Sequence, residues 1–259
     1  MSNIAKAFQN GKAFIGFLTG GDPSMEKTEE FALEMIRAGA DLIEIGVPFS
    51  DPIAEGTVIQ EANIRALSAG ATVRKLLDLV QKLRGKTALP LVFLTYINPI
   101  FRYGYDAFFE HAGKVGLDGI IIPDLPFEEH AEVRGAASRY GVDLISLIAP
   151  TSEARIAEIA KAASGYIYVV SSMGVTGTRN EITTDLDSII AAVRSATQLP
   201  TAIGFGIHTP EQAAKMAKIA DGVIVGSAIV RIIAEYGQAS ATQIYQYVKE
   251  MKAAISSAG

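Results

Sequence analysis

Short apolar runs alternate along the chain with longer segments that mix polar and apolar residues. The runs are rich in valine, isoleucine and leucine and are bounded by turn residues, which predicts buried strands. We expect eight such strands, over residues 13–19, 42–47, 91–96, 119–122, 144–148, 166–170, 201–204 and 222–225.

The segments between the runs have the period of an α-helix. Phe31 and Met35 lie four residues apart, and Thr209, Pro210 and Gln212 predict a helix start with a capping box. The clearest amphipathic stripe has the spacing i, i+3, i+4, i+7 and i+10, at Val73, Leu76, Leu77, Val80 and Leu83. We therefore expect helices that bury one face against the strands.

Glycines mark the joints of the repeated unit. Gly39, Gly116 and Gly141 each stand two residues before an aspartate that leads into a predicted strand. Because glycine readily adopts the left-handed conformation that ends many helices, we expect a helix to end at each of these positions.

Alternating strands and helices predict the α/β class and, for eight strands, a closed (β/α)8 TIM barrel. We expect a single domain over residues 1–259, since no linker or low-complexity stretch divides the chain. An open doubly wound sheet is the alternative. The loops after the second and sixth strands, over 48–70 and 171–184, are long, which is typical of lids and binding elements.

Composition excludes several classes of function. With 23 basic and 28 acidic residues the net charge is −5, which argues against a nucleic-acid-binding protein. The longest stretch without a charge, 162–178, is broken by glycines and hydroxyl residues and predicts no membrane span. Lys6 and Lys12 interrupt any apolar start, so we expect no signal peptide.

Residue types restrict the chemistry further. The chain has no cysteine, which excludes disulfides and thiolate sites and fits a cytoplasmic location. Its histidines, His111, His130 and His208, are far apart, so we expect no metal site. None of the eight runs contains a lysine, so we expect no Schiff-base amine at the barrel mouth.

Glycines after the last two strands predict a phosphate site. Gly204, Phe205 and Gly206 follow one strand, while Gly226 and Ser227 follow the next and open a helix. These are the two loops in which TIM barrels bind phosphate, through backbone N–H groups and a helix start. Tight turns without a ligand are the alternative.

Glu44 is the strongest candidate for acid–base chemistry. Strand residues alternate sides, so Glu44 points away from the aliphatic face formed by Ile43, Ile45 and Val47 and into the barrel. Burial without partners raises the pKa of a carboxyl group, which suits a general acid or base near neutral pH. A structural glutamate bonded to backbone donors or to Tyr168 is the alternative.

The loop after this strand, 48–56, carries two further acids, Asp51 and Glu55, between prolines and a glycine. Prolines at 48 and 52 restrict the backbone enough to hold an acid in place. Taken alone, the loop is better explained as a solvated acidic turn.

Taken together, the motifs resemble the tryptophan synthase alpha subunit family from end to end. They are LTGGDP at 18–23, EIGVPFSDP at 44–52, YINP at 96–99, PDLP at 123–126, GVTG at 174–177, GFG at 204–206 and GSAIV at 226–230. The resemblance implies retro-aldol cleavage of indole-3-glycerol phosphate to indole and glyceraldehyde 3-phosphate, in a TIM barrel that needs neither cofactor nor metal.

The resemblance also implies a role for each residue of the site. Glu44 matches the acid and base, Glu55 the second acid beside the indole nitrogen, and Tyr168 the tyrosine that orients Glu44. Substrate contacts fall on Phe17, Leu94, Tyr96, Thr176, Gly177, Phe205, Gly206, Gly226 and Ser227, while Asp51 and Asp124 match residues that couple the loops.

The chain departs from the family pattern at position 55, where relatives usually have aspartate. The extra methylene of Glu55 moves the charge, and a misplacement of ~1 Å can cost ~100-fold in rate. The resemblance further implies a beta subunit as partner, in an alpha2beta2 heterotetramer. A free-standing lyase, a non-catalytic activator of the beta subunit and a different phosphate-binding barrel enzyme, such as indole-3-glycerol phosphate synthase, are the alternatives.

Overall fold

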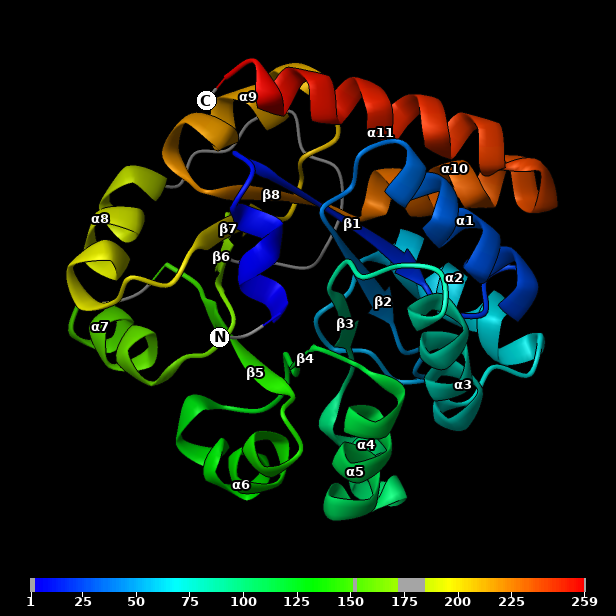
Figure 1. Cartoon of the computed structure of the whole chain (residues 1–259), viewed down its shortest axis with the longest axis horizontal. Coiled ribbons are helices and arrows are strands. Elements are labelled where there is room, and N and C mark those ends of the chain that lie inside the picture. The colour runs from blue at the N-terminus through cyan, green and yellow to red at the C-terminus, as the bar shows by residue number, and fades with distance from the viewer. Residues whose placement is uncertain (1–2, 151–152, 172–184, 259) are drawn as a thin grey trace.

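The computed structural model describes residues 3–150, 153–171 and 185–258. Its eight parallel strands close into a barrel in sequence order, as Figure 1 shows. This closed arrangement confirms the predicted TIM barrel, and the alternative of an open doubly wound sheet is wrong. The strands are β1 (Ala13–Thr19), β2 (Leu42–Gly46), β3 (Leu91–Leu94), β4 (Gly119–Ile121), β5 (Asp143–Ile148), β6 (Ile167–Val170), β7 (Thr201–Gly204) and β8 (Gly222–Val225).

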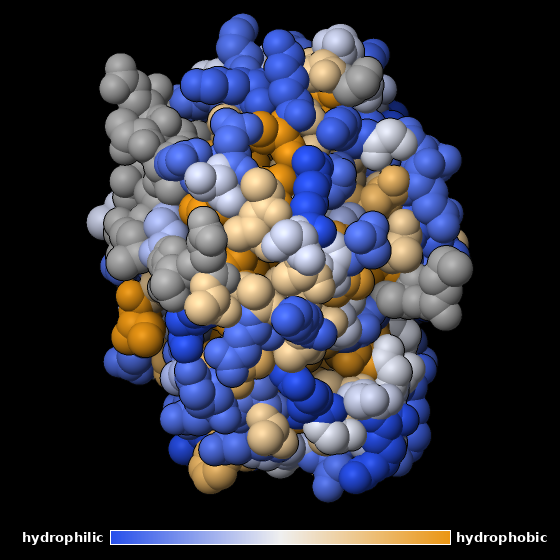
Figure 2. Space-filling model, turned by 90° about the vertical axis from the view of Figure 1, so that its left-hand side faces the viewer, coloured by the Kyte–Doolittle hydropathy of each residue, from blue (hydrophilic) through white to orange (hydrophobic). Residues whose placement is uncertain are grey.

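Helices surround the barrel (Figure 1). They are α1 (Met25–Arg37), α2 (Thr57–Ser68), α3 (Val73–Arg84), α4 (Ile97–Tyr103), α5 (Tyr105–Val115), α6 (Ala131–Arg139), α7 (Glu153–Ala162), α8 (Leu186–Ala196), α9 (Pro210–Ile219), α10 (Ser227–Tyr236) and α11 (Ala241–Ser256). Short 3-10 helices lie at η1 (Asn3–Phe8), η2 (Phe127–Glu129) and η3 (Gly237–Ala239). On the face that carries α7 and α8, hydrophilic side chains predominate, with apolar ones scattered among them (Figure 2).

The predicted long loop at 48–70 was partly wrong, because α2 occupies most of its second half. This helix buries Ile59, Ala62 and Ala66. Two of these side chains are alanines, so the apolar stripe is weak in the sequence. The other long loop, 171–184, lies outside the described residues after Ser171.

The predicted helix boundaries are confirmed. Gly39, Gly116 and Gly141 have φ angles of 108°, 83° and 73°, in the left-handed region that favours glycine. At α9, Thr209 and Gln212 form both hydrogen bonds of the predicted capping box.

Strand alternation separates two layers of side chains. Leu42 belongs to the cluster inside the barrel, whereas Ile43 and Ile45 pack in the outer cluster with the helices. Ile4 of η1 joins the inner cluster and lies against the backbone of Gly119, so η1 closes the amino end of the barrel. Glu44, between Ile43 and Ile45, therefore faces the interior, as the sequence predicts.

Aspartates connect neighbouring strands by hydrogen bonds at this amino end. The carboxylates of Asp41, Asp118 and Asp221 accept hydrogen bonds from the backbone N–H groups of Phe14, Leu91 and Thr201, at 2.7, 2.8 and 2.9 Å. Each bond joins the residue before one strand to the beginning of its neighbour. The aspartates thus satisfy backbone donors that the parallel ladder leaves without a partner.

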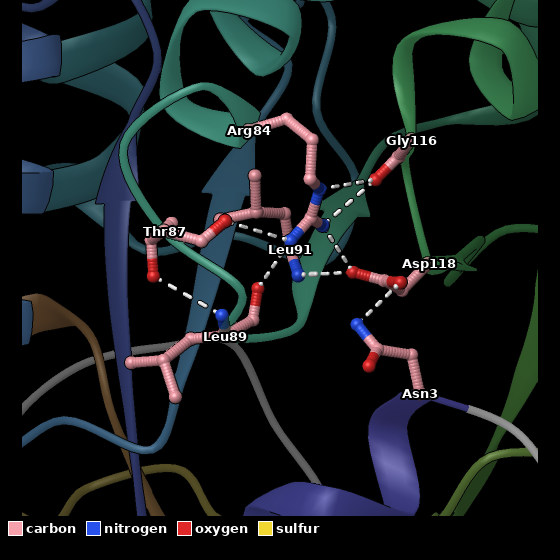
Figure 3. A network of polar contacts seen from close by, with 7 residues as sticks. All are labelled: Asn3, Arg84, Thr87, Leu89, Leu91, Gly116 and Asp118. Carbon is pink, nitrogen blue, oxygen red and sulfur yellow. Dashed lines mark hydrogen bonds and ion pairs between the residues drawn. The ribbon is translucent and has the colours of Figure 1, made fainter.

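Arg84 extends this network at the amino end (Figure 3). Its guanidinium pairs with Asp118 at 2.5 Å and donates to the backbone carbonyls of Gly116 and Leu89, both at 2.8 Å. Asn3 donates to the other oxygen of Asp118 at 2.9 Å, which fixes η1 to the barrel. Arg84 and Asp118 therefore pair with each other, and each also has further hydrogen-bond partners.

None of the helices in the described part of the chain combines the length and the apolar character required to span a membrane.

Candidate active site

A cavity opens at the carboxyl ends of the strands. Nine of the residues that the sequence singled out line it: Phe17, Glu44, Glu55, Leu94, Tyr168, Phe205, Gly206, Gly226 and Ser227. Residues from six different strands or their following loops thus meet in one site.

Glu44 lies on β2 with only 1% of its surface exposed. Its Oε2 atom has no hydrogen-bond partner among the described residues. Burial raises the pKa of the Glu44 carboxyl to about 8, because water no longer solvates the charged form. Glu44 therefore carries its proton at neutral pH. Among the described residues, Oε2 thus makes none of the bonds to backbone donors or to Tyr168 that the alternative of a structural glutamate requires.

Tyr168 lies on β6 and borders the same cavity. A Cβ atom at position 204 would lie 2.3 Å from its hydroxyl oxygen, so Gly204 provides the space that this hydroxyl occupies. The edge of the Tyr168 ring contacts Phe205, with ring centroids 6.0 Å apart. Position 204, at the end of β7, therefore requires glycine, because a larger residue would overlap the Tyr168 side chain on the neighbouring strand.

Tyr166 is a residue of this region that the sequence did not single out. It stacks on Tyr168 at 6.5 Å, is fully buried, and its hydroxyl has no partner among the described residues. Burial, and after it the charge of Glu44, raises the pKa of both tyrosines, so the three groups influence one another's titration. Alternation could have found Tyr166, since residues two apart on a strand share a face.

Glu55 precedes the N-cap of α2 and is 6% exposed. Burial raises the pKa of its carboxyl to about 7, while a hydrogen bond from Asn63 acts in the opposite direction. That bond runs from Nδ2 of Asn63 to Oε2 of Glu55 at 2.7 Å. The sequence did not indicate Asn63, because the pairing appears only once 57–68 is a helix.

The two buried carboxyl groups therefore differ in environment. Glu44 has an oxygen without a donor, whereas Glu55 accepts a bond that favours its charged form. The pKa values of about 8 for Glu44 and about 7 for Glu55 follow this difference, so Glu44 keeps its proton to higher pH than Glu55. One cavity thus holds two carboxyl groups whose environments separate their pKa values.

Tyr96 supports the loop after β2 and does not itself line the cavity. Its hydroxyl accepts a hydrogen bond from the backbone N–H of Ala54 at 3.0 Å, and its ring packs on Phe49 at 5.2 Å. This side chain is almost fully buried. Tyr96 thereby holds the loop that ends in Glu55.

Asp51 and Asp124 also lie outside the cavity lining. Asp51 is exposed and accepts a hydrogen bond from the hydroxyl of Ser50. Asp124 accepts a hydrogen bond from the backbone N–H of Ile97 at 2.9 Å, at the beginning of α4, and burial raises the pKa of its carboxyl. Thr176 and Gly177 lie outside the described residues.

The opposite end of the cavity has the features of an anion site. Phe205 and Gly206 have φ angles of 76° and 84°, so two successive residues adopt the left-handed conformation after β7. Ser227 begins α10, whose N-cap, Gly226, makes no side-chain capping bond. First-turn N–H groups and the Ser227 hydroxyl can therefore bind a phosphate.

Within 3–150, 153–171 and 185–258, no cluster of three or more histidine, aspartate or glutamate side chains has the arrangement of a metal site. The described residues thus combine a proton donor, a second acid, apolar walls and an anion-binding end.

Comparisons with known proteins agree with this geometry. A family model described as "Tryptophan synthase alpha chain" matches residues 4–256. The chain is 49% identical over 255 residues to the protein of that name from Lacticaseibacillus casei, covering 98% of this chain and 96% of the relative. The homologue from Lactiplantibacillus plantarum is 51% identical over 256 residues, with 98% and 97% covered.

Solved structures give the same result. The tryptophan synthase subunit alpha of Legionella pneumophila superposes with a TM-score of 0.89 at 35% identity and covers 98% of both chains. A chain from the tryptophan synthase complex of Pyrococcus furiosus superposes with a TM-score of 0.86 at 34% identity, with 94% of this chain and 99% of the other covered.

Proposed function

The chain belongs to the tryptophan synthase alpha chain family, which cleaves indole-3-glycerol phosphate in tryptophan biosynthesis, and we propose that Glu44, Glu55 and Tyr168 perform this cleavage. The observation that carries the proposal is the position of Glu44. It is a buried, protonated acid that shares one cavity with the anion-binding end at Gly226 and Ser227.

Glu44 moves the proton in both halves of the reaction. Its carboxyl group protonates the third carbon of the indole ring, which leaves a positive charge on the ring nitrogen. The resulting carboxylate then accepts the proton of the adjacent glycerol hydroxyl. As that oxygen becomes the aldehyde carbonyl, the electrons of the breaking carbon–carbon bond return to the ring and release indole.

Glu55 stabilises the intermediate through its negative charge. The ionised carboxylate faces the positive ring nitrogen in a cavity from which most water is excluded, where electrostatic interactions are strong. Asn63 keeps the carboxylate in place by its hydrogen bond at 2.7 Å. This anchoring supports a role for Glu55 despite the extra methylene relative to the usual aspartate.

The remaining residues bind and orient the substrate. Phe17 and Leu94 form apolar walls for the indole ring, and Tyr168 orients Glu44. Phe205, Gly206, Gly226 and Ser227 bind the phosphate through N–H groups and one hydroxyl. By family resemblance Thr176 and Gly177 complete the substrate contacts, while Tyr96, Asp51 and Asp124 act on the loops around the site.

We further propose that the chain works in the cytoplasm with a beta subunit, in an alpha2beta2 heterotetramer. Structural neighbours from Pyrococcus furiosus are described as a tryptophan synthase complex and as an a2b2 complex with mutual activation. On this chain Ile53 and Phe101 are 74% and 66% exposed, in or after the loops at the carboxyl ends of β2 and β3. We propose these two side chains as contacts for a beta subunit.

Indole release tests the proposal directly. The purified chain is supplied with indole-3-glycerol phosphate, with and without a beta subunit, and indole is measured over time. We expect turnover that is slow for the chain alone and faster in the complex. Equal rates would indicate a free-standing lyase. No indole in either condition, with the beta reaction still accelerated, would identify a non-catalytic activator.

A further inference from the structure

The turn after β7, at the anion-binding end of the cavity, is held from both sides by side chains that the proposed reaction does not use. Phe205 is the one non-glycine residue in the described part of the chain with a left-handed backbone, at a φ of 76°, and Gly206 follows at 84°. A left-handed phenylalanine is unfavourable, so the surrounding structure must hold it in place. The contacts of this turn therefore bear on how it binds an anion.

Ser171 holds the peptide unit between Phe205 and Gly206. It follows β6, is fully buried, and its hydroxyl donates to the backbone carbonyl of Phe205 at 2.5 Å. Its backbone N–H donates to the carbonyl of Gly204 at 3.1 Å. In a trans peptide unit the C=O and N–H groups point in opposite directions. Fixing the Phe205 carbonyl therefore also fixes the direction of the Gly206 N–H.

His208 holds the peptide unit on the other side of Gly206. Its Nδ1 atom bonds to the backbone carbonyl of Gly206 at 2.9 Å. Because a carbonyl oxygen only accepts hydrogen bonds, Nδ1 carries the hydrogen, and this contact fixes the tautomer of the ring. Gly206 thus lies between two fixed peptide units. A residue type that by itself rotates more freely than any other is restricted here to one conformation.

Two helices anchor His208 in turn. Its backbone N–H donates to the side-chain oxygen of Gln212, in the first turn of α9, at 2.9 Å. Its backbone carbonyl accepts a hydrogen bond from the hydroxyl of Tyr247 on α11, also at 2.9 Å. Both backbone groups of His208 are therefore bonded, so its imidazole reaches Gly206 from a fixed position.

We propose that Ser171 and His208 are positioning residues for phosphate recognition, which hold the Gly206 N–H in the direction that a phosphate monoester requires. The inference rests on the proposed function, since it takes the turn after β7 as part of the phosphate site. Neither side chain is among those that line the substrate cavity, so both act through the backbone. A donor that is fixed before the ligand arrives needs no ordering on binding, and only ligands that carry a phosphate benefit from it.

Paired binding measurements on the full chain test the proposal. Indole-3-propanol phosphate and indole-3-propanol differ only in the phosphate group, so the alcohol reports on the rest of the cavity in each variant. For His208→Ala and for Ser171→Ala we expect the Kd of the phosphate compound to rise about tenfold, while that of the alcohol changes less than about twofold. Equal weakening of both compounds, or unchanged binding of the phosphate compound, would overturn the proposal.

A matched control and a rescue variant separate the hydrogen bond from the loss of an imidazole. His111→Ala removes an imidazole on α5 that bonds to Tyr103, and it should change neither Kd. The amide of asparagine places an N–H close to the position of Nδ1, so His208→Asn should recover most of the phosphate affinity that His208→Ala loses. An asparagine variant as weak as the alanine variant would contradict the assignment.

A measurement on the wild-type chain covers the case in which these variants fail to fold. In the chain labelled with 15N-histidine, His208 should carry its hydrogen on Nδ1, both without ligand and with the phosphate compound bound. A hydrogen on Nε2 alone would overturn the proposal, because Nδ1 could then not donate to Gly206. The binding ratios do not depend on turnover, so a chain that shows them but releases no indole would refute the proposed function alone.

Discussion

The two ends of the barrel use carboxyl groups in opposite ways. At the amino end, Asp41, Asp118 and Asp221 each accept a backbone N–H, and Asp118 is also paired with Arg84. At the carboxyl end, Glu44 is more deeply buried and one of its oxygens has no donor. The same type of group is thus satisfied where it stabilises the fold and unsatisfied where it carries a proton.

This difference explains why only one end is reactive. At the amino end each carboxylate accepts hydrogen bonds from its neighbours and so holds adjacent strands together. A carboxyl group buried without donors keeps its proton to a pKa of about 8, at the expense of folding stability. Stability and reactivity are therefore divided between the two ends of the same strands.

Removing the Glu44 carboxyl should have the largest effect on activity. In Glu44→Gln the group that donates and accepts the proton is replaced by an amide of similar size, so we expect turnover to fall by about 10³-fold or more. Indole release reports the loss, and binding of a phosphate-containing substrate analogue should survive. The exposed Glu110→Gln serves as control. Unchanged turnover would remove Glu44 from the mechanism.

The same variant should be more stable than the wild type at high pH. The folded pKa of Glu44, about 8, lies above its ordinary value of 4.5, so unfolded chains release this proton first as pH rises. Wild-type stability should therefore fall by up to about 1.4 kcal/mol per pH unit between these values relative to Glu44→Gln. Denaturant unfolding at pH 5 and pH 8 measures the difference. A difference independent of pH would contradict the raised pKa.

Breaking the hydrogen-bond network at the amino end should lower stability and leave turnover unchanged. Arg84→Ala removes the ion pair with Asp118 and the donor to three backbone carbonyls, those of Gly116, Thr87 and Leu89, so we expect the free energy of unfolding to fall by about 2–3 kcal/mol. Turnover per folded chain should not change. Lys114→Ala, which removes the exposed pair with Glu110, should have almost no effect on stability. A comparable loss in both variants would argue against a special role for Arg84.

Asn63→Ala should have the smallest of these effects. Losing the N–H donor raises the pKa of Glu55 above about 7, because that bond favours the charged form. We expect turnover at neutral pH to fall roughly tenfold and the acidic limb of the rate profile to move to higher pH. Gln60→Ala is the matched control, since Gln60 donates to the backbone carbonyl of Glu55. An unshifted limb would show that Asn63 has only a structural role.

Much of this architecture could be predicted because its signals are local. Strand alternation alone placed Glu44 inside the barrel, and β1, β7 and β8 have the predicted bounds. Gly39, Gly116 and Gly141 end helices because glycine itself adopts the left-handed conformation at no steric cost.

The parts that could not be predicted depend on contacts between distant segments. Asn63 reaches Glu55 only because α2 forms where the sequence indicates a loop. Tyr96 matches a family position in the substrate pocket, yet its hydroxyl bonds to the backbone N–H of Ala54 and its side chain does not line the cavity. His130 stands alone in the sequence, and its buried environment arises from η2, β5 and α7 together. Tertiary packing, which no local pattern encodes, decides each of these cases.

The protonation of Glu44 is the most direct test of how this barrel works. The chain is labelled with 13C at the glutamate carboxyl carbons, and their NMR resonances are followed from pH 4 to pH 10, with Glu44→Gln identifying the signal of residue 44. We predict that this carboxyl group titrates near pH 8, well above the ordinary value of 4.5. Titration near 4.5 would mean that Glu44 is ionised at neutral pH and cannot be the proton donor.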